Sequence, residues 1–311
     1  MLPILLKTLP FFGLAGLGYL AGQMRFFTAE ATAALTKFVF YFALSAMLFR
    51  FAATLSLGEV FSWSFVFAYL TASFAVYLLV FCVAILRGVS LPEATVEAQC
   101  AVVGNVGFLG VPMLVLLMGQ QAAGPVLLVL AIDLIVFSSL ITILMTLNRE
   151  GRMRWGVAGA LVSGLARNPM IVSMVAGLIW GATGLSLWAP IDEFLSLLGA
   201  AATPGAMFAI GASLAGRTAE RIEVAGWLAL AKLFLHPGAV ALAALTLFSV
   251  EPGAAAVMIA AASLPVAGNV YILAAHYGVA PQRVSTSILM STGASILTVS
   301  AIIAMVTGGT S

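Results

Sequence analysis

The chain has 311 residues, of which 63% are hydrophobic and only 8% are charged, and its formal net charge is +2. Soluble domains carry about 25% charged residues, so this composition excludes a water-soluble globular domain and indicates that lipid surrounds the folded chain. The two cysteines, Cys82 and Cys100, are too few for a disulfide framework or a metal site, and we interpret them as packing residues.

Ten segments are apolar over about the 20 residues that a helix needs to cross the hydrocarbon layer. We predict membrane-spanning helices at residues 3–23, 33–55, 61–86, 94–118, 124–147, 167–185, 190–215, 224–247, 252–276 and 283–307. The first segment, with Lys7 before an apolar run and "LAGQ" as a cleavage site, could also be a signal peptide. We favour a mature first helix, because no basic n-region precedes Lys7 and the segment has a counterpart later in the chain. The predicted fold class is an all-α polytopic membrane protein.

Basic residues lie on alternate predicted loops. They are Arg25, Lys37, Arg87, Arg149, Arg152, Arg154, Arg167, Arg217, Arg221 and Arg283. Because Lys and Arg are enriched on the cytoplasmic side, we expect a cell (inner or plasma) membrane protein with both termini outside the cytoplasm. The run "NREGRMRW" could also be a nucleic-acid patch, but the topology signal explains it more simply, and no nucleic-acid partner is expected.

The second half of the chain repeats the first weakly but in order. The matches are "AGLGYLAG" (15–22) with "AGLIWGAT" (176–183), "LSAMLF" (44–49) with "PGAMFA" (204–209), and "VVGNV" (102–106) with "VAGNV" (266–270). The offsets stay between about 160 and 164 residues. We predict two five-helix repeats of opposite orientation, residues 1–147 and 167–311, joined by a short cytoplasmic connector at 148–166.

The fourth and ninth predicted spans contain residues that weaken helices. They are Gly104, Asn105, Gly107, Gly110 and Pro112 in "GNVGFLGVP", and Pro265, Gly268 and Asn269 in "SLPVAGNVYILAAHYG". Proline removes a backbone donor, and freed backbone groups must be buried in protein or line a wet cavity. A simple proline kink, satisfied by neighbouring helices, is the alternative for one span alone. Two breaks in corresponding spans of inverted halves favour a binding site at the midplane.

In these residues the chain resembles the auxin efflux carrier family, whose bacterial members include malonate and malate permeases. "GNVGFLGVP" is similar to the family's fourth-span crossover, where an Asn precedes a Pro by seven residues, as Asn105 precedes Pro112. "SLPVAGNVYILAAHYGVAP" resembles its ninth-span motif. "LAKLFLHPG", with Lys232, and "AIDLIVF", with Asp133, also resemble the family.

The resemblance implies a ten-helix inverted 5+5 repeat of the kind found in NhaA and bile-acid symporters, with broken, crossing helices 4 and 9. Spans 1, 2, 6 and 7 would form a scaffold, and spans 3–5 and 8–10 a transport core that moves as an elevator. The implied function is alternating-access transport of a small organic anion. Ser45 and Val270 stand where prolines are expected, Val270 replacing one found in plant members, and these departures weaken auxin itself as the substrate.

Asn105 and Asn269 are the leading candidates for substrate binding, with Gly104, Gly107 and Gly268 beside them. An amide offers two donors and an acceptor, and helix N-termini offer unpaired N–H groups, so a carboxylate could be held without a full charge. The alternative is that either Asn only joins two helices. Gly110, Pro112 and Pro265 are assigned to the helix breaks.

Two candidate residues for binding or coupling, Lys232 and Asp133, are charged residues deep within predicted spans. Lys232 could bind the anion or exchange a proton, or it could snorkel to the cytoplasmic interface. Asp133, near the middle of the fifth span, could be a proton or ion site, or could cap the broken fourth helix. His236 shares the helix face of Lys232 and is interpreted as a packing or interface residue, and Arg50 is expected to snorkel.

Small residues complete the predicted core. Ser45, Ser291 and Thr292 are candidates for lining it, because Ser and Thr commonly join membrane helices. The glycines at positions 13, 16, 18 and 22 are expected to allow close helix contact.

The sequence contains no phosphate loop, zinc-ligand spacing or nucleophile elbow, so we expect neither a cofactor, nor a metal, nor an enzyme. The leading hypothesis is a secondary transporter of a small mono- or dicarboxylate. A sodium-coupled bile-acid-type symporter and a passive anion channel are the alternatives. Substrate identity, a proton or sodium as coupling ion, the direction of transport and assembly as a homodimer stay open.

Overall fold

The computed structural model describes residues 2–55, 61–150, 155–215 and 221–308, and within these ranges the regular elements are all helical. The α-helices are α1 Leu2–Gln23, α2 Ala29–Phe38, α3 Leu44–Ala53, α5 Trp63–Leu86, α6 Leu91–Val102, α7 Val111–Met118, α8 Ala123–Ile132, α9 Ser138–Glu150, α10 Trp155–Arg167, α11 Pro169–Ala182, α12 Ala189–Ala200, α13 Ala202–Leu214, α14 Ile222–Leu230, α15 His236–Leu242, α16 Pro252–Ala262, α17 Gly268–Tyr277 and α18 Pro281–Gly308. Short π-helical or 3₁₀ segments join several of them, namely η1 Val39–Ala43, η2 Val106–Gly110, η3 Gln120–Ala122, η4 Asp133–Phe137, η5 Ala231–Leu235 and η6 Ala243–Leu247.

Seven helical segments in the described part of the chain are long and apolar enough to cross a membrane. They are Leu2–Gln23, Ala29–Ala53, Trp63–Leu86, Gln120–Asn148, Ala189–Leu214, Ile222–Leu247 and Pro281–Gly308. An eighth results if the bent pair Leu161–Arg167 and Pro169–Ala182 counts as one span. The other two predicted spans, 94–118 and 252–276, are each interrupted in the middle, and the structure divides them into shorter helices.

The connector predicted at 148–166 is largely helical rather than a loop. Its α10 meets α11 at a bend of 72°, where Asn168 accepts a hydrogen bond from the Met170 amide and so begins the second helix. Arg152 and Arg154 of this connector, and Arg217 further on, lie outside the described residues.

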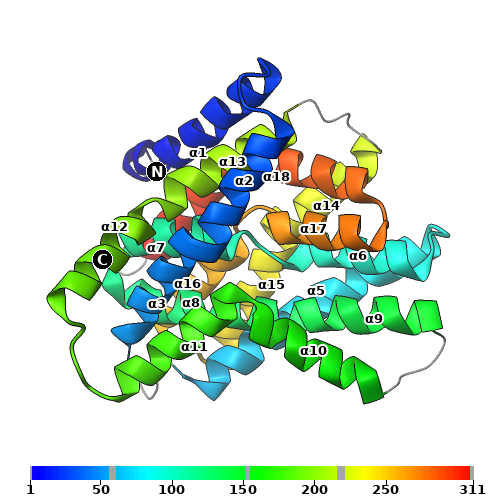
Figure 1. Cartoon of the computed structure of the whole chain (residues 1–311). Coiled ribbons are helices and arrows are strands. Elements are labelled where there is room, and N and C mark those ends of the chain that lie inside the picture. Colours follow the sequence, from blue (N-terminus) through cyan, green and yellow to red (C-terminus); the bar gives the residue numbers. More distant parts are fainter. Residues whose placement is uncertain (1, 56–60, 151–154, 216–220, 309–311) are drawn as a thin grey trace.

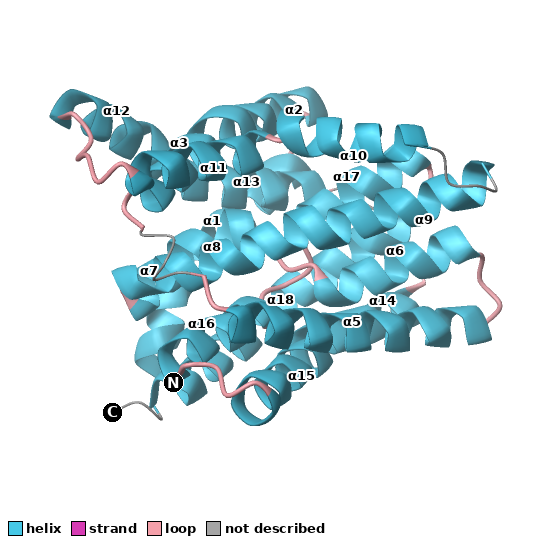
Figure 2. Ribbon diagram, turned by 90° about the horizontal axis from the view of Figure 1, so that it is seen from below, coloured by secondary structure: helices cyan, strands magenta, loops and turns pink. Residues whose placement is uncertain are grey.

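Both ends of the described chain lie at one end of the helix bundle. Figures 1 and 2 show the start of α1 and the end of α18 at this end, which is called the terminal end below, and the turn from α5 to α6 at the other. Arg87 follows α5 directly at that opposite end. Because both ends lie on one side of the bundle, the arrangement is consistent with an even number of membrane crossings. Which side of the membrane each end of the bundle faces stays a prediction.

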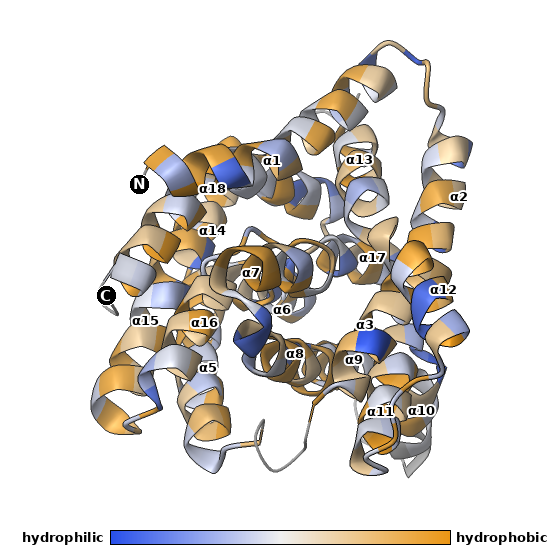
Figure 3. Cartoon of the chain, turned by 90° about the vertical axis from the view of Figure 1, so that its left-hand side faces the viewer, coloured by the Kyte–Doolittle hydropathy of each residue, from blue (hydrophilic) through white to orange (hydrophobic). Residues whose placement is uncertain are grey.

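Large apolar side chains cover the outside of the bundle. Leu17, Leu78 and Leu197 are all exposed, and the hydropathy colouring of Figure 3 shows orange segments on many of the peripheral helices. Trp63 and Trp188 are exposed as well, which is typical of the membrane–water interface. In the same view α7 lies near the centre, surrounded by the other helices. Lipid is therefore the solvent that this surface requires.

The close contact of α1 with α13 depends on small residues. A Cβ atom at Gly18 would collide with the backbone carbonyl of Phe208, and one at Gly22 would come within 2.9 Å of the Ala212 oxygen. Nothing lies within 4 Å of the corresponding positions on Gly13 and Gly16. The expectation of close helix contact therefore holds for Gly18 and Gly22 and is wrong for the other two glycines.

Candidate functional site

The interruptions of the two predicted spans lie against each other. After α6 ends at Val102, residues 103–105 leave the helix, and the chain becomes helical again at Val106. Gly104 pairs with Val266 as an antiparallel bridge, the Asn105 amide donates to the Pro265 carbonyl at 2.8 Å, and the Ala267 amide donates to the Val103 carbonyl at 3.1 Å. Each break thus provides hydrogen-bond partners for backbone groups of the other break. Lipid could not provide such partners.

The two asparagines lie beside these breaks. Asn105 is buried, Asn269 is half-buried, and the Oδ1 atom of each has no hydrogen-bond partner in the described part of the chain. Asn105 directly precedes η2, and Asn269 lies in the first turn of α17. No side chain caps either helix start, although the Val106 and Val270 amides donate to the Gly104 and Ala267 carbonyls. The two asparagines and two helix starts therefore flank the same pair of hydrogen-bonded breaks, an arrangement that can bind an anion.

The prolines of the motifs occupy different positions. Pro112 lies inside the helix that resumes at Val106, at the point where the π-helical η2 passes into the first turn of α7, and it supplies no N–H to that helix. Pro265 lies within the second break, and its carbonyl accepts the Asn105 amide. The first break therefore arises at residues 103–105, before Pro112, and glycine rather than proline opens the chain there.

The glycines differ in how closely they are packed. A Cβ atom at Gly104 would lie 3.2 Å from Lys232 Nζ and 3.4 Å from the Ala261 carbonyl, a tight contact that would require the lysine to shift. At Gly107 and Gly110 the nearest atoms, at 2.5 and 2.6 Å, are the flexible ends of neighbouring side chains, and nothing lies within 4 Å of a Cβ position on Gly268. The first three glycines are therefore closely packed, whereas Gly268 is not.

Lys232 is fully buried, and the snorkelling alternative for it is wrong. Its Nζ donates to the Ala262 carbonyl at 2.5 Å and lies 3.1 Å from His236 Nδ1. Ala262 is the last residue of α16, so the lysine places its charge at a helix C-terminus beside the second break. His236, interpreted from sequence as a packing or interface residue, is buried and also lies 2.9 Å from the Ser73 hydroxyl through Nε2.

Asp133 is buried on the other side of the same region. Its Oδ1 accepts from the Tyr69 hydroxyl at 2.9 Å, its Oδ2 has no hydrogen-bond partner among the described residues, and its carboxylate interacts with the Gly104 backbone amide. The charges of Asp133 and Lys232 are close enough to interact, although no direct ion pair joins them in the described part of the chain. Asp133 and Lys232 therefore both lie next to Gly104.

Two members of this cluster, Tyr69 and Ser73, were absent from the sequence-based candidates. Both are buried on α5, and they bind Asp133 and His236 respectively. A signal for them existed, because Tyr69 and Ser73 precede Lys232 and His236 by 163 residues each, within the range of offsets of the predicted repeat. A search for polar residues at matched positions of the two halves would have found them.

The three core-lining candidates have separate roles. The Ser291 hydroxyl accepts from the Val266 amide at 3.1 Å and donates to the Ile288 carbonyl, so it supports the second break. Ser45 donates to the Phe40 carbonyl of its own helix at 3.3 Å. Thr292 is half-buried, and its carbonyl accepts from Ser295. Of these three residues, Ser291 is the one that hydrogen-bonds to the second break.

An ion-pair network holds the first turns of α6 and α18 together, at the opposite end from the termini. Arg283 Nη1 donates to Glu97 Oε1 at 2.6 Å, Arg283 also contacts Glu93 at 3.4 Å, and Arg87 binds the second oxygen of Glu97. Glu97 and Arg283 are both almost completely buried. Arg283, read from sequence as a loop residue, therefore also fixes the helix that supplies Ser291.

No group of three or more potential metal ligands occurs among the residues that the structure describes. Residues 3–303 match the family described as "Membrane transport protein". Over 304 residues the chain is 30% identical to a protein of Rhizobium meliloti (strain 1021) that is named "Putative malonate transporter". That alignment covers 97% of this chain and 95% of the relative.

Proposed function

Because this chain belongs to the membrane transport protein family, the family of the auxin efflux carriers, we propose that it is a secondary carrier for a small mono- or dicarboxylate. It is a multi-pass membrane transporter that binds a small-molecule substrate within the lipid bilayer, and it is not an enzyme. The carrier works by alternating access. Malonate is the first substrate to test, since it is named for the relative.

One observation carries the proposal. The two helix breaks hydrogen-bond to each other, and Asn105 and Asn269 lie beside them with unpartnered side-chain oxygens in the described residues. Rotation of an amide about its last side-chain bond presents either the NH₂ group or the oxygen to a ligand. A carboxylate then accepts from the amides and from the first-turn N–H groups of α17, and a protonated carboxyl group can donate to an amide oxygen.

The proposed transport cycle uses two parts of the chain. Residues 1–147 and 167–311 form inverted repeats, in which the broken segments cross within a core and spans 1, 2, 6 and 7 form the scaffold. Movement of the core against the scaffold changes the side from which the breaks are reached. Support comes from the matched positions of the breaks, since Asn105 and Asn269 are 164 residues apart.

Asp133 and Lys232 provide the coupling in this proposal. Both lie next to Gly104 and are the in-span charges nearest the first break. A substrate anion that binds at the breaks changes the electrostatic environment of both groups, and transfer of a proton at one of them would compensate for its charge. Proton coupling is preferred over sodium coupling, because the neighbours of Asp133 are a hydroxyl group and a backbone amide, not a second carboxylate.

Flux into liposomes tests the function. The purified protein should take up labelled malonate or malate, show counterflow with unlabelled substrate, and lose this flux when Asn105→Ala removes the amide. Asn148→Ala is the matched control, because Asn148 is exposed on α9 away from the breaks. Normal flux in a correctly folded Asn105→Ala protein would refute the site, non-saturating flux without counterflow would indicate a channel, and dependence on a sodium gradient would indicate a sodium symporter.

A further inference from the structure

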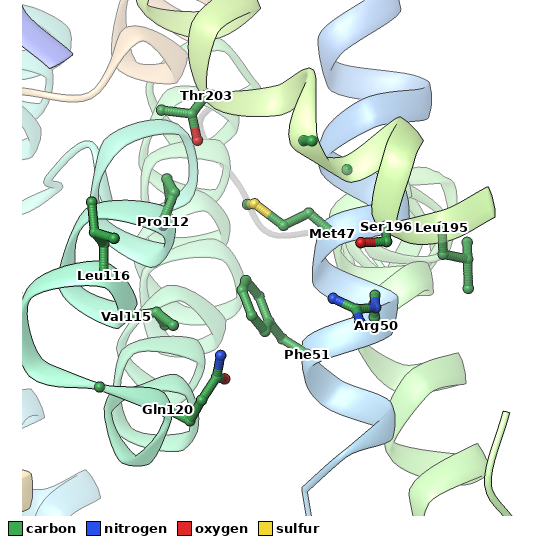
Figure 4. A pocket seen from close by; sticks show the side chains of 13 residues that line it. Met47, Arg50, Phe51, Pro112, Val115, Leu116, Gln120, Leu195, Ser196 and Thr203 are labelled. Atoms are coloured by element: carbon green, nitrogen blue, oxygen red, sulfur yellow. The ribbon is translucent and has the colours of Figure 1, made fainter. Parts of the chain in front are cut away.

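A hollow lies at the terminal end of the bundle, apart from the helix breaks. It is a cavity of about 540 Å³ between α3, α7, η3 and α12. Figure 4 shows Arg50 and Phe51 on one wall, Pro112 and Gln120 on the facing wall, and Ser196 beside Arg50. A volume of this size is typical of small-molecule sites.

Arg50 supplies the positive charge of this cavity. Its Nε donates to Asp192 Oδ1 at 2.6 Å and its Nη2 donates to Oδ2 at 3.2 Å, so the arginine binds a carboxylate of α12. Both side chains are 39% exposed. A guanidinium group has five N–H donors, and this pair uses two of them. Three donors stay available for a second carboxylate.

The cavity is connected in sequence to the site at the breaks. Pro112 and Val115 of its wall belong to α7, the helix that follows the first break through η2. The opposite wall is formed by α3 and α12, which belong to the proposed scaffold, whereas α7 belongs to the proposed core. The cavity therefore lies at a boundary that alternating access would open and close.

We propose that this cavity is a receiving site for small carboxylates at the terminal end of the protein, with Arg50 as the recognising residue and Asp192 as its competitor. The proposal rests on the proposed transport function. Because Asp192 already occupies part of the guanidinium group, an incoming anion is attracted but held weakly. Weak binding suits a site from which the substrate must pass on to Asn105.

The charge of the cavity can be measured without transport. Single cysteines are placed on the two walls as Ser196→Cys and Gln120→Cys, in a Cys82→Ser background, with the buried Cys100 left in place. The full-length protein in neutral detergent then reacts with an anionic and with a cationic methanethiosulfonate reagent of similar size. The ratio of the two rates reports the local potential, because both reagents form the same type of disulfide.

Arg50→Gln should lower the anionic-to-cationic rate ratio about three- to tenfold at both cysteines, the change in this ratio that one charge about 6–13 Å away produces in water. Asp192→Asn should raise the ratio in the same range, and 1 M salt should reduce both effects. Arg50→Lys, which keeps the charge, is the matched control and should leave the ratio within twofold. An unchanged ratio in a folded Arg50→Gln protein overturns the receiving site.

Transport kinetics form the second arm. Arg50→Gln should raise the apparent KM for substrate offered from the terminal end about three- to tenfold and leave the maximal rate near its original value. If the unmodified protein transports no carboxylate, the proposed function is wrong. The anionic-to-cationic rate ratio of the thiol reagents then still decides whether the cavity attracts anions. If transport occurs but its KM is unaffected by Arg50→Gln, the cavity does not lie on the substrate path.

Discussion

Lys232→Met tests whether the buried lysine stabilises the junction of the two breaks. Methionine keeps most of the apolar stem and removes the charge. The Ala262 carbonyl then loses its 2.5 Å bond, and an unsatisfied buried carbonyl costs about 1–3 kcal/mol. Asp133 also loses the cation with which it interacts, but no direct ion pair joins the two groups in the described residues, so the lost hydrogen bond is the main effect. We therefore expect a loss of about 1–3 kcal/mol in the free energy of unfolding.

Denaturant unfolding in detergent micelles, followed by tryptophan fluorescence, measures this loss. Lys37→Met is the matched control, because Lys37 is exposed and its removal should change the stability by less than about 0.5 kcal/mol. The double variant Lys232→Met with Asp133→Asn should recover about 1–3 kcal/mol relative to the sum of the single changes, since the two charges interact. A loss below about 1 kcal/mol for Lys232→Met, or strict additivity in the double variant, would refute this reasoning.

Two further stability predictions follow from close contacts in the same assay. Gly18→Ala should cost about 1–3 kcal/mol or more, because the added methyl group collides with the Phe208 backbone and forces α1 away from α13. Glu97→Gln should cost about 3–5 kcal/mol, because it removes the buried carboxylate charge that compensates the buried Arg283.

Each of these variants has a control on the same helix. Gly16→Ala adds a methyl group to open space and should leave the stability unchanged or slightly higher. Glu93→Gln removes a partly exposed carboxylate 3.4 Å from Arg283, which should cost less than about 1 kcal/mol. Equal losses for a variant and its control would show that the contact in question is not the cause.

The interrupted segments were found from sequence because their cause is local. Glycine, asparagine and proline within an apolar run weaken a helix whatever surrounds it, and Gly104 and Pro265 do lie where the chain leaves the helical conformation. Pro112 was grouped with the break and lies just after it, where η2 passes into α7. The resemblance to the auxin efflux carriers, which rests on the same residues, is confirmed by the family match over residues 3–303.

The environment of the charged residues could not be found in this way. From sequence, Lys232 could lie in the protein interior or reach the membrane interface. The position of a residue along a helix does not show which face of that helix packs against other helices. Tyr69 and Ser73 were missed because a hydroxyl group within an apolar span is ordinary until its partner is known. Arg50 was expected to snorkel, but its partner Asp192, 142 residues away, could not be identified from sequence.

The sequence by itself determined that lipid surrounds this protein, where its helices approximately lie and at which two places helices are interrupted. These depend on the transfer of each segment into lipid and on local backbone propensity, which are sums over neighbouring residues. Only the tertiary structure decided that the Asn105 amide binds the Pro265 carbonyl and that Lys232 binds the Ala262 carbonyl. These contacts depend on how each helix is rotated and how far it is shifted against its neighbours, and packing of the whole chain sets both.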